Sequence, residues 1–87
     1  MDVIEPAPTE FSTFRVVRDG SVVAILRTLD HAGATKVIAE LFTDGPDGPQ
    51  SAGIRPYAFG GRREAAAFLD DAVGTFTYLG CEIQPGT

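Results

Sequence analysis

The residue types best suited to binding chemistry in this chain stand together at Gly60, Gly61, Arg62 and Arg63. A glycine pair that leads into a helix can present free backbone N–H groups, and the helix dipole favours an anion there. Two arginines add charge-assisted donors. This pattern predicts an anion- or phosphate-binding site at Gly60–Arg63. The alternative is a strand-to-helix turn whose arginines are solvated.

Catalytic and metal-binding patterns are sparse. His31 follows Asp30 in an expected turn, where the pair can act as a general base or a pH-sensitive contact, but no nucleophile signature accompanies it. With one His and one Cys, the chain lacks the ligands of the usual Cys/His zinc site. Cys81 follows a helix-capping glycine, so we expect a buried, unreactive thiol. We therefore expect no catalytic residue, no metal and no cofactor.

The acidic residues form no convergent pair either. Asp70 and Asp71 are adjacent on an expected helix, so their side chains point about 100° apart and do not build a two-carboxylate site with Glu64. The segment Asp44–Gly53 repeats Asp-Gly-Pro, but it offers too few ligands for calcium. Its composition predicts a surface loop.

Strands dominate the first two thirds of the chain. Phe11–Thr28 holds two runs rich in β-branched and aromatic residues around Asp19-Gly20, the pair preferred in two-residue type I′ turns. Thr35–Thr43 predicts a third strand. Ile54–Phe59 predicts a fourth strand. Because proline cannot donate to the ladder, Pro56 indicates that this strand either lies at an edge of the sheet or starts irregularly.

One amphipathic helix is predicted over Arg62–Leu79, ending at Gly80. Its apolar residues recur at helical spacing, at Ala65, Phe68, Leu69, Ala72, Val73, Phe76 and Leu79. Cys81-Glu82-Ile83 can add a short fifth strand. The sequence thus predicts one α+β domain over residues 10–84, between tails at 1–9 and 85–87: an antiparallel four-stranded sheet in β-β-β-β-α order, with the C-terminal helix packed on one face.

The two-residue turn also predicts the faces of the sheet, because it places Val17 opposite Val22 and Phe14 opposite Ile25. The face expected to pack on the helix carries Phe14, Val16, Val23 and Ile25. The opposite face mixes apolar and charged residues and stays uncovered, because one helix covers one face. That predicted interface comprises Phe11, Thr13, Arg15, Val17, Val22, Leu26, Ile38, Glu40 and Phe42.

Composition narrows the classes of partner. The net charge of −5 argues against a nucleic-acid module, and no apolar run is long enough to span a membrane. The first residues lack a secretory pattern, so we expect a cytoplasmic protein. An uncovered apolar face often marks an interface. The sequence therefore predicts a small, non-catalytic interaction or regulatory module that forms a homodimer or binds another protein, with Arg15 and Glu40 setting the register.

Three alternatives remain open, and the least favoured is a small enzyme, because one His and one Cys leave little chemistry to assign. The uncovered face can be solvated and partly covered by the N-terminal tail. The domain can also bind a phosphate-containing ligand or single-stranded nucleic acid, using Gly60–Arg63 and the exposed sheet.

Overall fold

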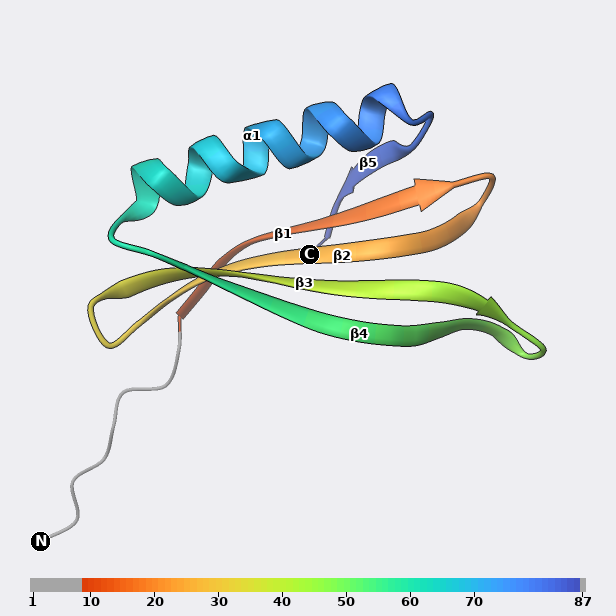
Figure 1. Ribbon diagram of the computed structural model, residues 1–87, viewed down its shortest axis with the longest axis horizontal. Coiled ribbons are helices and arrows are strands. Elements are labelled where there is room, and N and C mark those ends of the chain that lie inside the picture. Colours follow the sequence, from red (N-terminus) through yellow and green to blue (C-terminus); the bar gives the residue numbers. More distant parts are fainter. Residues whose placement is uncertain (1–8, 87) are drawn as a thin grey trace, which may run out of the picture.

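Five strands form one antiparallel sheet in the order β4-β3-β2-β1-β5, and one helix lies against one of its faces (Figure 1). This computed structural model describes residues 9–86, without the side chains of Thr9 and Phe11. The elements are β1 (Thr9–Arg18), β2 (Ser21–His31), β3 (Ala34–Gly45), β4 (Gly48–Phe59), α1 (Arg62–Tyr78) and β5 (Glu82–Pro85). The predicted α+β class is confirmed, and the fifth strand pairs with β1. Of the tail expected over residues 1–9, residues 1–8 lie outside the described residues, and Thr9 is the first residue of β1.

Tight turns join the first four strands. Asp19-Gly20 forms the predicted turn, with φ angles of 52° and 81°, the positive values that a type I′ turn requires. The next turn, at Ala32-Gly33, has similar φ angles of 54° and 79°. The loop predicted over residues 44–53 is wrong, because β3 and β4 pair up to a turn at residues 46–47. Ladder pairing gives these backbone groups hydrogen-bond partners and outweighs their turn propensity.

A β-bulge in β2 changes the predicted faces. Val17 pairs with Val22 as expected, but Val16 pairs with Ala24, so Val23 is an extra residue on β2. From Ala24 onward, the side chains of β2 lie on the face opposite to the one predicted.

The correction concerns two residues above all. Leu26, predicted on the uncovered face, is 2% exposed and belongs to the core under α1. Ile25, predicted in the core, lies on the other face beside Arg15 and Glu40. Phe14, Val16 and Val23 pack against the core as expected.

The core lies between α1 and the inner face of the sheet. Its buried apolar residues are Val16, Ala24, Leu26, Val37, Ala39, Ala65 and Leu69. Half-buried phenylalanines surround it, and Phe68 on α1 lies 4.7 Å from Tyr57 and 5.3 Å from Phe59, measured between ring centroids. Leu79 does not join the apolar stripe as predicted, because it follows the last helical residue and is 53% exposed.

The end of α1 has the hydrogen bonds of a Schellman motif. The N–H of Gly80 donates to Thr77 O and the N–H of Cys81 donates to Phe76 O, both at 3.0 Å. Gly80 has a φ of 88°, as the predicted helix stop requires. Cys81 is half-buried and packs against the core, and the chain continues directly into β5.

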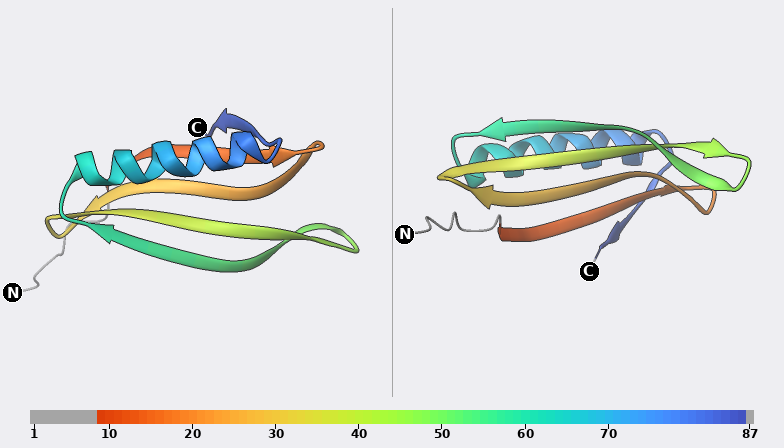
Figure 2. Two further views of the ribbon diagram at one scale, coloured as in Figure 1. Left: turned by 45° about the horizontal axis from the view of Figure 1, so that its top comes forward. Right: turned by 90° about the horizontal axis from the view of Figure 1, so that it is seen from below.

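The helix is shorter than the sheet that it covers. Its 17 residues span about 26 Å, whereas the 12 residues of β3 or β4 span about 40 Å. The far end of the β3–β4 hairpin therefore extends beyond α1 (Figures 1 and 2). β4 lies at the edge of the sheet, one of the two possibilities that Pro56 indicated, and most of its residues are exposed.

Two buried threonines on neighbouring strands allow a matched test of polar burial. Thr28 is 1% exposed, and its hydroxyl has no hydrogen-bond partner among the described residues. We expect Thr28→Val to raise the free energy of unfolding by about 1 kcal/mol, because an unsatisfied buried hydroxyl is replaced by a methyl group. Urea denaturation measures this change.

Thr35→Val is the control for this substitution. Thr35 is equally buried, but its hydroxyl donates to Asp30 Oδ1 at 2.8 Å. The same replacement should lower the free energy of unfolding by about 1 kcal/mol. Equal losses in both variants would show that the Thr28 hydroxyl also makes a stabilising hydrogen bond.

Candidate functional site

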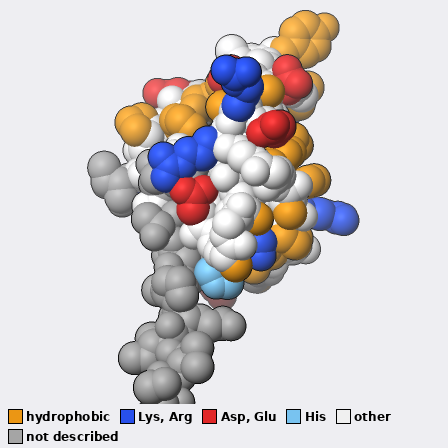
Figure 3. Space-filling model, turned by 90° about the vertical axis from the view of Figure 1, so that its left-hand side faces the viewer, with side chains coloured by type: hydrophobic (Ala, Val, Ile, Leu, Met, Phe, Trp, Pro, Cys, Tyr) orange, Lys and Arg blue, Asp and Glu red, His pale blue; other side chains and the backbone are white. Residues whose placement is uncertain are grey.

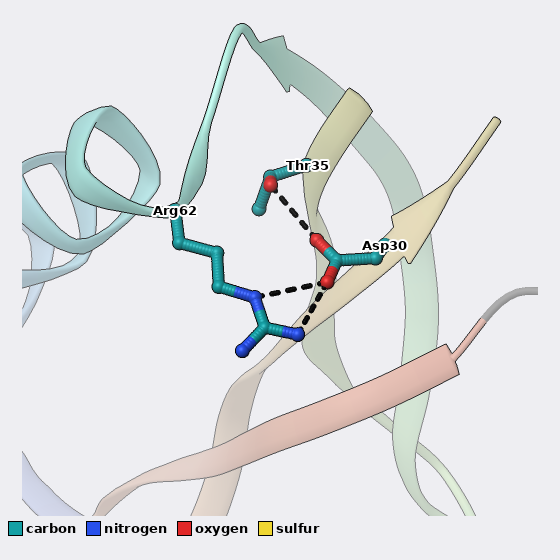
Figure 4. Close-up of polar contacts among 3 residues, drawn as sticks. All are labelled: Asp30, Thr35 and Arg62. Atoms are coloured by element: carbon teal, nitrogen blue, oxygen red, sulfur yellow. Dashed lines mark hydrogen bonds and ion pairs between the residues drawn. The ribbon is translucent and has the colours of Figure 1, made fainter. Parts of the chain in front are cut away.

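The start of α1 is held to the sheet by an ion pair (Figure 4). Both Nε and Nη2 of Arg62 donate to Asp30 Oδ2, at 2.9 and 2.5 Å. The Thr35 hydroxyl donates to the other carboxylate oxygen of Asp30. Asp30 lies near the end of β2, Thr35 near the start of β3 and Arg62 at the first helical residue, so three elements meet at one carboxylate.

This arrangement explains how an arginine is tolerated at a helix N-terminus. A positive charge there opposes the helix dipole, whereas a carboxylate is favourable. Asp30 supplies that carboxylate from β2, while the N-cap residue Gly61 contributes no side-chain hydrogen bond. The hydrogen bonds from Arg62 and then Thr35 lower the pKa of Asp30 below its ordinary value of 3.8.

The predicted anion site is therefore built around an internal anion. Gly60, Gly61 and Arg62 line an open depression of about 340 Å³, together with Asp30 and Thr35. A phosphate approaching Arg62 meets the Asp30 carboxylate beside it, which repels a second negative charge. Arg63 is exposed and does not line this depression. Seen from this end, acidic and basic side chains lie beside one another (Figure 3).

The larger candidate site is the face of the sheet opposite α1, here called the outer face. The right-hand view of Figure 2 looks onto it, and none of the described elements crosses in front of strands β1 to β4. Strand pairing and alternation put these side chains on it: Glu10, Thr13, Arg15, Val17, Val22, Ile25, Arg27, Leu29, His31, Lys36, Ile38, Glu40, Phe42, Asp44, Ser51, Ile54, Pro56, Ala58, Glu82 and Gln84.

Charged and apolar side chains alternate across this face. Ile25 lies between Arg15 on β1 and Glu40 on β3, whereas Arg27 lies between Thr13 and Ile38. The β1–β2 part of the face is hollowed by an open depression of about 690 Å³. The outer face therefore offers apolar contacts and paired charges in one continuous surface.

Two acidic residues of the outer face make polar contacts: Glu40 near its centre and Glu10 at its rim. Arg27 Nη1 lies 3.9 Å from Glu40 Oε1, and the hydroxyl of Ser51 donates to Glu40 Oε2 at 3.0 Å. At the rim, the Thr13 hydroxyl donates to Glu10. Glu40 thus lies between a cation and a hydroxyl donor, which fixes its carboxylate on the surface.

The structure brings together most of the predicted interface residues on the outer face: Thr13, Arg15, Val17, Val22, Ile38, Glu40 and Phe42. Leu26 does not belong there, and the side chain of Phe11 lies outside the described part of the structure. Sequence reasoning missed Ile25, Arg27 and Leu29 on this face. Arg27 carried the signal, because keeping its charge out of the core requires Ile25 to lie on the same, outer side.

The remaining sequence candidates do not converge. Asp30 lies on the helix side of β2, so the alternation of strand side chains directs His31 to the other face. Within residues 9–86, no group of three or more His, Cys, Asp or Glu is placed to hold a metal ion. No helix in this described range is long and apolar enough to cross a membrane.

Comparison with known proteins adds no assignment. No family model, curated protein or solved structure matches the chain. The proposals below therefore depend on the geometry of the chain itself.

Asp30→Asn tests the charge at the start of α1. Because the pKa of Asp30 is lowered in the folded protein, its ionised form stabilises the fold above about pH 4, and this contribution is lost as the pH falls through the lowered pKa. We expect wild type to have the higher urea midpoint at pH 7. The difference between the two proteins should shrink below about pH 3.

Asp70→Asn provides the control, because Asp70 is exposed on α1 and has no hydrogen bond or ion pair with the described residues. Its midpoint should follow that of wild type across the same pH range. A gap for Asp30→Asn that stays constant down to pH 2 would contradict the electrostatic explanation.

Proposed function

We propose that this protein is a small, non-catalytic interaction module that forms a homodimer through its outer face. The observation that carries the proposal is the presence of both signs of charge among the apolar residues of that face. Arg15, Arg27 and Lys36 share the surface with Glu10, Glu40 and Glu82, and Asp44 lies at its far end. A twofold interface brings the same patch of two copies together, so it must be complementary to itself.

Apolar side chains supply the attraction in this interface. Ile25, Ile38 and Val17 are half-buried on an uncovered face, and Ile54 is 61% exposed. Removing such surface from water contributes roughly 25 cal/mol for each Å². Four strands about 4.8 Å apart and roughly 35 Å long give the whole outer face a plane area of about 670 Å², below the roughly 800 Å² that each partner contributes in a standard interface.

Proline at both edges of the sheet favours association through the face. The edge strand β4 contains Pro49 and Pro56, and β5 at the other edge has four residues and ends at Pro85. A proline cannot donate a backbone hydrogen bond to an added strand. Continuous pairing of a second copy along either edge is therefore unfavourable.

The geometry gives less support to binding of phosphate or single-stranded nucleic acid. Lys36, Arg27 and Arg15 lie on neighbouring strands, which favours a polyanion, but Glu40 contacts Arg27 and lies among them. Phe42 and His31 carry the only aromatic rings on the outer face among the described side chains, so stacking platforms are few.

Ile38→Glu tests the dimer. Ile38 lies in the middle of the outer face, where a buried carboxylate without a partner would oppose association. We expect light scattering to give a dimer for wild type and a monomer for Ile38→Glu. The dissociation constant should rise at least 100-fold, and the circular dichroism spectrum should stay unchanged because the side chain faces solvent in the monomer.

Tyr78→Glu is the matched control, because Tyr78 is 90% exposed at the end of α1 and lies away from the outer face. This variant should remain a dimer. A wild-type monomer at millimolar concentration would contradict the proposal, as would tight, salt-dependent binding of an oligothymidine to the same face.

A further inference from the structure

We propose that the twofold axis of this dimer runs diagonally across the outer face, along a stripe of apolar residues. This inference rests on the proposed function, and it specifies which residues of the two copies meet. The stripe comprises Ala58, Ile38, Ile25 and Val17, one residue from each of β4, β3, β2 and β1. Each residue of the stripe lies on the strand next to that of the previous residue, and two residues further in the direction of β3.

The registers of the strands place the stripe. Ala58 pairs with Lys36, and Ile38 is two residues further along β3. Glu40 pairs with Ile25 on β2, again two residues beyond Ile38. The same step leads from Ile25 to Val17, because Ile25 pairs with Arg15 on β1.

Opposite charges flank the stripe on its two sides. Lys36, Arg27 and Arg15 follow it on one side, one to each strand from β3 to β1. Glu40 lies on the other side, together with the uncharged Pro56 and Val22. Glu10 and Glu82 lie further out on the side of the cations. The stripe therefore separates the three cations beside it from Glu40.

A twofold axis along the stripe exchanges its two sides. It places Arg27 of each copy over Glu40 of the other, so two ion pairs form across the interface. Ile25 and Ile38 then meet their own counterparts near the axis. The same operation brings Ile54 of one copy between Thr13 and Leu29 of the other, nearer to Thr13.

Two other in-plane axes each bring at least one charge to an unfavourable partner. An axis parallel to the strands between β2 and β3 superposes cross-strand partners, so Arg27 would cover Ile38 and Glu40 would cover Ile25. An axis across the strands at the level of Arg27 would pair Glu40 with Lys36 but would place Arg27 on its own copy at the centre of the interface. The diagonal axis places Arg15 over Val22 and Lys36 over Pro56, but it brings no like charges together. Because burying like charges against each other costs free energy, the diagonal axis is favoured.

The diagonal also fixes the angle between the two sheets. Strands lie about 4.8 Å apart, and residues two apart along a strand are separated by about 6.8 Å, so the stripe makes about 35° with the strands. The strands of the two copies then cross at about 70°, which is nearer to the orthogonal than to the aligned class of sheet packing.

The decisive experiment mixes two charge-reversal variants, Arg27→Glu and Glu40→Arg. Each variant alone places like charges across both interface pairs, and its dissociation constant should rise at least tenfold. In the mixture, a heterodimer has two acidic groups on one chain facing two basic groups on the other. We expect its dissociation constant to return to within about threefold of the wild-type value.

The mixture separates contacts within a chain from contacts between chains. Arg27 and Glu40 already lie 3.9 Å apart in one chain, and in each variant this internal pair stays repulsive. Rescue can therefore arise only across the interface. If wild type dimerises and Ile38→Glu does not, but the mixture shows no rescue, the axis is wrong while the proposed dimer stands. A monomeric wild type would reject both.

Crosslinking locates the axis independently. In a Cys81→Ala background, Ile38→Cys should be joined to its own copy by a short bifunctional maleimide, because residues near the axis face each other across about 10 Å. Thr13→Cys is the control. Thr13 lies two diagonal rows away from the stripe, so the Thr13 residues of the two copies are displaced sideways from each other by about 15 Å. Strong crosslinking at Thr13 with none at Ile38 would contradict the diagonal axis.

Discussion

The β-bulge at Val23 determines which side chains of the central strands lie in the core and which remain on the surface. An extra residue places Val23 and Ala24 on the helix side together, so Leu26 and Thr28 follow on that side. Arg27 is kept out of the core by the same shift. Because side chains alternate along a strand, this one local irregularity fixes the composition of both faces from Ala24 to the end of β2.

The helix is attached where this arrangement leaves suitable partners. Asp30 lies on the helix side of β2, on the same alternation as Thr28, and there it binds Arg62 at the start of α1. At the other end, the Schellman motif at Gly80 directs the chain into β5 beside β1. The helix is thus held at both ends, by an ion pair on the inner face and by the chain that continues into the edge strand β5.

The outer face depends on the same constraint. With Ile25 and Arg27 turned outward, Ile38 and Ile25 become diagonal neighbours, and Arg27 comes within reach of Glu40. Without the bulge, Ala24 and Leu26 would replace them, and this surface would lose its central cation. The proposed dimer and its axis therefore depend on the β-bulge at Val23, a residue that is not itself part of the outer face.

Much of this protein could be predicted from the sequence alone, because it depends on local chemistry. Asp19-Gly20 determined the first turn because few other pairs adopt two positive φ angles, and the 3.6-residue period of α1 and its glycine stop determined the helix. Pro56 correctly indicated an edge strand as one of two possibilities. These features depend on residues that are close in the sequence.

The tertiary structure decided what depends on distant partners. Residues 44–53 have the composition of a loop, yet pairing between β3 and β4 extends through them, because ladder hydrogen bonds satisfy their backbone. The bulge buries Leu26 and leaves Arg27 solvated at the same time, and a register derived from the turn alone ignores both effects. Asp30 and Arg62 are 32 positions apart, and only the folded chain brings the carboxylate to the helix start. Local sequence determined the elements, whereas burial and charge pairing across strands determined which face each residue occupies.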